Sequence, residues 1–209
     1  MSAVAPSART EKREHRKTAR REAILAAARK VFGEKGFEGT TIADVAREAG
    51  VASGTVYLYY ASKLDLFAAL NAQLFELILR ALQEAKAPPD LRGGTRARIH
   101  AVFEACSQHR DLLRLVFLNP DPRTELARRM RRADEERMRP LAQLLAGGMS
   151  AGVVRQADPL LLAKIVTGLV SVALFQCFVQ SDGREAQAYE DTVTDMIAGG
   201  LTPTEPRNP

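Results

Sequence analysis

Residues 40–67 read TTIADVAREAGVASGTVYLYYASKLDLF, and this stretch decides the fold. Thr41 and Asp44 stand three residues apart, a spacing typical of the capped start of a short helix. That helix is expected to end near Gly50, where the turn needs a permissive backbone. Ser53 is then placed to cap a second helix. Two short helices joined by so tight a turn predict a helix-turn-helix.

The second of these helices has an inner and an outer side. Val56 and Tyr60 are four residues apart and share one face, which we assign to the interior. Exposed hydroxyls on a slender helix can bond to phosphate oxygens or base edges in a major groove. Gly54 lets the backbone approach DNA closely, and Lys63 can meet a phosphate together with the first amides of the helix capped by Ser62. The outward residues are Ser53, Thr55, Tyr57 and Tyr59.

The remaining sequence is also helical in pattern. Apolar residues recur every three or four positions, and no run alternates as a strand would. Pro- and Gly-containing breaks separate the segments, such as APPD at residues 87–90. The predicted fold class is all-α, with about nine helices. The later helices are expected at residues 95–108, 110–118, 122–147, 158–181 and 184–199.

The positive charge gathers at the N-terminus. Residues 9–22, RTEKREHRKTARRE, hold seven basic and three acidic side chains, which accounts for +4 of the chain's net +5. Such a segment indicates a polyanion partner, either DNA or an anionic membrane surface. The alternative interpretation is a solvated tail without a partner.

Residues 40–67 resemble the DNA-binding signature of the TetR family of transcriptional regulators, and ILAAARKVFGEKGFEGT at residues 24–40 resembles that family's first helix. The resemblance covers about residues 20–70. It implies a three-helix DNA-binding domain, a linking fourth helix, and a helical domain for ligand binding and dimerisation. Tyr60 departs from the family pattern, where phenylalanine is common, and its hydroxyl could bond nearby or reach a phosphate. The positions that the resemblance assigns to DNA contact are Thr41, Ser53, Gly54, Thr55, Tyr57, Tyr59 and Lys63.

Three segments follow from this placement: a flexible basic arm at residues 1–17, the helix-turn-helix domain at 18–64, and the regulatory and dimerisation domain at 65–203. The arm gains a second interpretation, because basic residues that precede or open the first helix lie close to where a DNA backbone would run. We assign DNA contact there to Lys17, Arg20 and Arg21, with a free tail as the alternative.

Residues 160–179, LLLAKIVTGLVSVALFQCFV, are apolar nearly all round and long enough to span a membrane, but Lys164 and Gln176 interrupt them. We interpret this segment as a helix buried on most sides. The family resemblance implies that it and the last helix form a four-helix interface with a second subunit, the alternative being a thicker monomeric core. The interface residues that we predict are Leu161, Gly168, Ser171, Val172, Val193, Met196 and Ile197.

An effector pocket is expected between that helix and residues 95–147. Its apolar lining favours a hydrophobic or acyl-like ligand, and the arginines of residues 128–139 could meet the phosphates of an acyl-CoA. The alternative is strong, because aromatic and methionine side chains at helical spacing are usually core. The candidate lining residues are Phe103, Cys106, Leu113, Phe117, Met130, Met138, Leu174, Phe175 and Phe178.

Little else points to chemistry. Cys106 and His109 could supply two metal ligands, but no further cluster completes a site, so we expect no metal and no cofactor. Cys106 and Cys177 fit small buried hydrophobes better than a redox switch. No nucleophile elbow, phosphate loop or dinucleotide motif indicates an enzyme. The N-terminus lacks a signal-peptide pattern, which predicts a cytoplasmic protein.

The resulting hypothesis is a homodimeric repressor that binds a palindromic operator and is released by a small effector. An activator or corepressor-dependent regulator of the same fold is the nearest alternative. Two other classes stay open at this point: a DNA-processing enzyme that uses the module for targeting, and a lipid-carrying helical protein whose basic arm docks on membranes.

Overall fold

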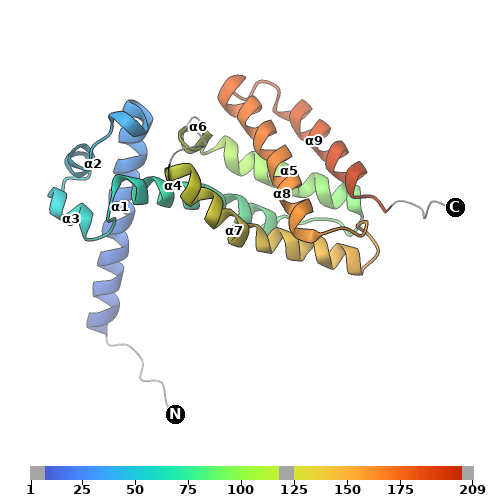
Figure 1. The fold of residues 1–209 in the computed structure, drawn as a ribbon, viewed down its shortest axis with the longest axis horizontal. Helices are drawn as coiled ribbons and strands as arrows, with labels where there is room; N and C mark the ends of the chain where they lie inside the picture. The colour runs from blue at the N-terminus through green and yellow to red at the C-terminus, as the bar shows by residue number, and fades with distance from the viewer. Residues whose placement is uncertain (1–7, 118–124, 204–209) are drawn as a thin grey trace, which may run out of the picture. The chain divides into compact units, whose positions relative to one another are not determined.

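The computed structural model describes residues 8–117 and 125–203, with side chains over residues 12–117 and 136–203. These residues form nine α-helices and one π-helical segment, and no strand occurs among them (Figure 1). The predicted all-α fold is confirmed. The chain divides into two compact units, Met1–Asn71 and Ala72–Pro209, which are described separately.

The first unit holds three helices and the start of a fourth: α1 (Ala8–Gly39), α2 (Ile42–Glu48), α3 (Ser53–Tyr57) and α4 (Lys63–Glu84). Its core is built by apolar residues at helical spacing, among them Ile24, Val45 and Val56, each with no exposed surface. Phe67 of α4 makes edge contacts with Phe32 and Phe37, whose ring centres lie 5.6 and 5.3 Å away. Burial of these rings stabilises the unit.

Local chemistry sets the helix ends in this unit. Thr41 Oγ1 accepts a hydrogen bond from the Asp44 backbone N–H (3.1 Å), and the Asp44 carboxylate accepts one from the Thr41 backbone N–H (3.1 Å), which completes the predicted capping box. Gly50 has φ +65°, so the turn requires the left-handed backbone that glycine adopts without strain. Ser62 caps α4 through the Asp65 N–H at 3.1 Å, as expected.

The second unit contains the remainder of α4 and five further α-helices. Figure 1 shows α5 beside α9 and α7 beside α8, in agreement with their packing contacts. Its core includes Phe103 and Phe178, whose ring centres lie 5.7 Å apart. The elements are α5 (Leu91–Ser107), α6 (Arg110–Phe117), α7 (Glu125–Ser150), α8 (Pro159–Leu174), the π-helix η1 (Phe175–Gln180) and α9 (Ala186–Leu201).

The apolar helix of the second unit differs from its prediction. By length and composition, Pro159–Gln180 could cross a membrane, and only 28% of its most apolar window is buried. The expectation of burial on most sides is therefore wrong for the single chain. One face packs within the unit, whereas Leu161, Ile165 and Val172 are 56%, 57% and 60% exposed. These three residues form the exposed side of the helix within the second unit.

Two boundaries also differ from those expected. Helix α1 already begins at Ala8. The described part of the predicted flexible arm, residues 8–17, therefore belongs to this helix. The boundary between the two compact units lies between residues 71 and 72, within α4, and not at residue 64. A capped helix start is visible in a sequence, whereas the point along a continuous helix where packing partners change is not.

Candidate nucleic-acid interface and effector cavity

The inner and outer sides of α3 are those that its spacing predicts. Val56 has no exposed surface and Tyr60 is 4% exposed, whereas Tyr57 is 55% exposed. Ser53, Thr55 and Tyr59 are half-buried. The exposed side of α3 therefore presents one phenol with two aliphatic hydroxyls and a further phenol close by.

Two details of α3 leave groups available for a partner. The N-cap is Ala52 and no side chain caps the helix, so Ser53 is the first helical residue instead of the cap that we expected. Gly54 is exposed, and a Cβ added to it would meet no atom within 4 Å. Nothing inside the described chain therefore requires glycine at this position, which leaves open space on the outer side.

Leu58, at the C-terminal end of α3, is a candidate contact that the sequence prediction missed. Its side chain is 82% exposed, the largest exposure among the bulky apolar residues described. An apolar side chain beside hydroxyls can contact the methyl group of thymine in a major groove. Its position between the inward residues Val56 and Tyr60 could have indicated from the sequence that Leu58 faces outward.

Thr41 and Lys63 are both engaged within the domain. The Thr41 hydroxyl donates to Asp44 Oδ2 at 2.7 Å. Lys63 Nζ donates to the Phe37 carbonyl at 2.7 Å and the Glu38 carbonyl at 3.3 Å, and it lies 4.5 Å from the centre of the Phe37 ring. Lys63 thus satisfies carbonyls at the C-terminal end of α1. Both residues hold the domain together, and this leaves them few donors for DNA.

Charged neighbours shape two further groups. A hydrogen bond from Lys35 (2.8 Å), together with those from Thr41, holds the pKa of the Asp44 carboxyl well below its ordinary value. Burial raises the pKa of Tyr60, although the Arg21 guanidinium lies 5.7 Å from the ring centre. The Tyr60 hydroxyl is enclosed by protein, so it does not extend to a phosphate as the sequence left open.

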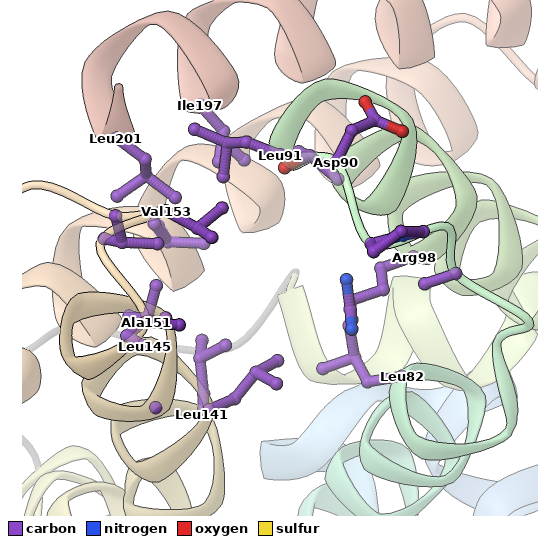
Figure 2. A pocket seen from close by; sticks show the side chains of 18 of the residues that line it. Leu82, Asp90, Leu91, Arg98, Leu141, Leu145, Ala151, Val153, Ile197 and Leu201 are labelled. Atoms are coloured by element: carbon purple, nitrogen blue, oxygen red, sulfur yellow. The ribbon is translucent and has the colours of Figure 1, made fainter. Parts of the chain in front are cut away.

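The second unit contains a cavity of about 580 Å³. Figure 2 shows Leu141, Leu145 and Ala151 on one side, and Leu82 and Arg98 on the other. Most of the lining is apolar. The polar lining residues are Asp90, Thr95, Arg98 and Gln143. The volume is within the usual range for small-molecule sites.

The two charged residues of the cavity differ in how they are satisfied. Asp90 caps α5, because its Oδ1 accepts from the Gly93 N–H at 2.7 Å. Arg98 is half-buried and donates to the Gly94 carbonyl at 3.0 Å. Within the described residues, no carboxylate forms an ion pair with Arg98. The guanidinium is therefore the group best placed to receive an anion in this cavity.

The predicted pocket residues do not line this cavity. Five of them are packed core residues: Phe103, Cys106, Leu113, Leu174 and Phe178. Phe117 and Phe175 are half-buried with ring centres 6.0 Å apart, Met138 is half-buried, and the side chain of Met130 lies outside the described residues. The cavity forms instead where the loop at residues 87–90 approaches the end of α7. Small and ring-constrained residues there, APPD and AGGMSAG, were the signal that could have indicated it.

The predicted interface residues separate into two groups. Leu161, Gly168, Val172 and Met196 are exposed and Ser171 is half-buried, whereas Val193 and Ile197 are 3% and 6% exposed and belong to the chain's own core. Helical periodicity reveals an apolar stripe but not which stripe faces inward. Ile165, which the prediction missed, completes the outer series Leu161, Ile165, Gly168 and Val172 on α8.

Metal chemistry has no support in the described residues, where no group of three His, Cys, Asp or Glu side chains could hold an ion. His109 Nδ1 instead lies 3.0 Å from the Ala105 carbonyl oxygen. Burial raises the pKa of the Cys106 thiol to about 12 and also raises that of Cys177. Both thiols are buried, which agrees with the prediction that they act as small apolar residues.

Comparison with known proteins places this site among DNA-binding regulators. The family described as "Bacterial regulatory proteins, tetR family" matches residues 24–70. The HTH-type transcriptional activator FasR of Mycolicibacterium smegmatis is 31% identical over 101 residues, which are 48% of this chain and 46% of that protein. The HTH-type transcriptional repressor BepR of Brucella suis is 47% identical over 47 residues, 22% of either chain. The chain thus spans less than half the length of these two relatives.

The whole fold also has solved counterparts. The transcriptional regulator FadR from Bacillus subtilis, solved in complex with stearoyl-CoA, superposes with a TM-score of 0.72 at 21% identity, covering 86% of this chain and 98% of that one. Likeness at this identity concerns the fold, and the ligand named is that protein's own.

Proposed function

This chain belongs to the TetR family of bacterial regulatory proteins, and we propose that it is a homodimeric transcriptional repressor that acts in the cytoplasm. It binds a palindromic operator and is released by a small hydrophobic, acyl-like effector. The observation that carries the proposal is the exposed outer side of α3, set above the buried Val56 and Tyr60 within the matched segment.

In the DNA-bound state the outer side of α3 enters a major groove. Tyr57 and Leu58, the most exposed residues of this side, make the main contacts with base edges. The hydroxyls of Ser53, Thr55 and Tyr59 donate or accept further hydrogen bonds, and Gly54 allows the backbone to approach the DNA closely. Thr41 and Lys63 act mainly by holding α2, α1 and α4 in place, since their donors are used internally. Lys17, Arg20 and Arg21 of α1 supply positive charge toward phosphates.

Dimerisation uses the outer face of α8. Leu161, Ile165 and Val172 form an exposed aliphatic series, and Met196 of α9 is 57% exposed. Gly168 lies in the same series, and a Cβ there would meet nothing within 4 Å, so the face also permits close approach. A second copy of the chain would bury this surface, and twofold symmetry would let two α3 helices read half-sites about 34 Å apart.

The effector occupies the cavity of the second unit. Apolar walls suit a hydrocarbon chain, and Arg98 suits an anionic group, so a fatty acid, or an acyl-CoA through its phosphates, fits better than a neutral hydrocarbon. FadR of Bacillus subtilis, with its stearoyl-CoA, is a protein of the same fold with such a ligand. The effector can shift the DNA-bound state only by its affinity difference between states, about 5.5 kcal/mol for a switch from 1:99 to 99:1.

An activator remains the second candidate, because one relative of the N-terminal part is named an activator and another a repressor. The test begins with selection of duplexes from a random pool by the whole chain. We expect enrichment of a palindrome and its release by dodecanoate but not by dodecanol. Failure to enrich any duplex would overturn the proposal, and enrichment with tighter binding in the presence of dodecanoate would favour the corepressor-dependent alternative.

A further inference from the structure

The N-terminal part of α1 carries basic residues in a regular series. The series comprises Lys12, Arg13, Arg16, Lys17, Arg20 and Arg21, and it precedes Ile24, the first buried residue of the helix. Every residue from 12 to 20 is exposed. Figure 1 shows this part of α1 continuing past α2 and α3 as an unsupported helix. We call these six residues the basic side of α1.

Their spacing places all six on one half of the helix. Steps of one and three residues alternate along the series, and at 100° per residue such steps return to the same side at each turn. Glu14 and Glu22 fall on the other half. The charges are therefore segregated, which a merely solvated helix does not require.

The basic side is in register with the face of α1 that packs into the domain. Continuing by three or four residues, the series leads to Ile24, Ala28 and Val31, none more than 4% exposed. At the junction, the Arg21 guanidinium lies 5.7 Å from the ring centre of Tyr60, three positions after Tyr57. The basic side thus extends, beyond the folded domain, the side of α1 on which the helix-turn-helix packs.

Among the described residues, no carboxylate forms an ion pair with any of Lys12, Arg13, Arg16, Lys17 and Arg20. The series covers about 14 Å of helix at 1.5 Å per residue. A duplex carries one negative charge for about every 1.7 Å of its axis, so the basic side matches a polyanion of high linear density.

We propose that the basic side of α1 lies along the sugar–phosphate backbone of the duplex that flanks each half-site. There it adds sequence-independent contacts over about four base pairs beyond those read by α3, since 14 Å corresponds to about four steps of 3.4 Å. This inference rests on the proposed DNA-binding function and deepens it. A rigid helix in this role differs from a flexible arm, because its contacts require helical register and a duplex long enough to reach.

The test uses the duplex that the whole chain selects from a random pool, in two lengths: the palindrome alone, and the palindrome with six added base pairs on each side, which is about 20 Å of extra duplex per side. The K12Q/R13Q/R16Q variant removes three charges from the basic side. The matched control, H15E/T18E/A19E, lowers the net charge equally on the opposite half of the same helix. Circular dichroism verifies that both variants keep their helicity.

We expect the native chain to bind the long duplex more tightly than the short one, and the triple Gln variant to bind both alike. For the triple Gln variant on the long duplex, the slope of log affinity against log salt should be smaller by about 2.7, which is about 0.9 for each of the three charges removed. The ratio of native to variant affinity should therefore fall about 40-fold between 50 and 200 mM salt. The control should keep the native length dependence.

Intact binding of the palindrome with an unchanged slope and no length dependence would overturn the inference while leaving the proposed function standing. An equal loss in the control would also overturn it, because net charge alone would then explain the effect. Phosphatidylserine vesicles supply a third arm: vesicle binding lost in the Gln variant, with DNA binding unchanged, would assign the basic side to membranes. If no duplex is selected at all, the proposed function fails and the inference fails with it.

Discussion

The outer sides of α3 and α8 are both exposed, but their chemistry differs. The outer side of α3 combines Tyr57 and Leu58 with hydroxyls of Ser53 and Thr55, in a unit whose α1 is strongly basic. The outer face of α8 is aliphatic over Leu161, Ile165 and Val172. Hydrogen-bonding groups beside cations suit a polyanion, whereas a plain aliphatic face suits another aliphatic face. A contiguous exposed series of such side chains indicates a surface for a partner, and its composition indicates which kind of partner.

The largest effects are expected from substitutions in the cores of the two units, which should act separately on DNA binding and on dimerisation. Phe67→Ala removes a fully buried ring that contacts Phe32 and Phe37, which should destabilise the first unit by about 3–5 kcal/mol. DNA binding should be lost while sedimentation still reports a dimer. Phe103→Ala is the reciprocal variant, and it should abolish the dimer. Loss of the dimer in Phe67→Ala would contradict the independence of the two cores.

A charge on the outer face of α8 should have the next largest effect. Ile165→Glu would bury a carboxylate without a partner in the proposed interface, which raises the dimer dissociation constant by at least about 100-fold, or about 3 kcal/mol. Sedimentation equilibrium measures this constant. Gln108→Glu adds the same charge at an exposed position outside α8 and α9, and it should leave the constant unchanged. An unaffected dimer in Ile165→Glu would remove α8 from the interface.

On α3 the expected losses are smaller and confined to DNA. Tyr57→Ala should weaken binding of the selected operator by about 10- to 100-fold, or about 1–3 kcal/mol, with unchanged helicity and dimerisation because the side chain is 55% exposed. Tyr57→Phe isolates the hydroxyl and should retain most of the affinity. Fluorescence anisotropy measures both. Unfolding of Tyr57→Ala would mean that the phenol supports the core.

Lys63→Gln tests whether a cation can serve the domain and not the DNA. The Lys63 ammonium bonds to the Phe37 and Glu38 carbonyls, so its loss should lower the free energy of unfolding by about 0.5–1 kcal/mol. The salt slope of operator binding should fall by clearly less than the value of about 0.9 that one phosphate contact gives. A full decrease with unchanged stability would restore the phosphate role that the sequence suggested.

The smallest effect concerns thiol reactivity. Burial raises the pKa of Cys106 to about 12, so at pH 8 the thiol stays protonated and nucleophilic thiolate is scarce. We expect no reaction of Cys106 or Cys177 with a disulfide reagent in the native protein and complete reaction in guanidinium. Rapid labelling of native protein would show that the second unit opens readily.

The first unit could be predicted closely because its determinants are local. Thr41 with Asp44, the φ of Gly50 and the pair Val56 and Tyr60 act within a few residues of each other. One departure is also local, because Ala52 and not Ser53 is the N-cap of α3. Another involves a distant partner: the Lys63 ammonium bonds to carbonyls of α1, 25 and 26 residues away, and no local pattern indicates this.

The second unit resisted prediction for the same reason on a larger scale. The same periodicity describes Val193, which is buried, and Met196, which is exposed, because the choice depends on which helix packs alongside. The cavity likewise forms between segments far apart in the chain, residues 88–90 and 141–154, and no local pattern brings them together.

The burial of both cysteine thiols has a practical consequence for measuring DNA and effector binding by this protein. The chain has no tryptophan, and both of its cysteines are buried. A single cysteine introduced at Leu58 would therefore be the sole position open to a dye, and a tryptophan introduced at Leu141 would be the sole indole emitter. Binding of DNA and filling of the cavity could then be recorded in separate optical channels, and neither change replaces a fully buried side chain.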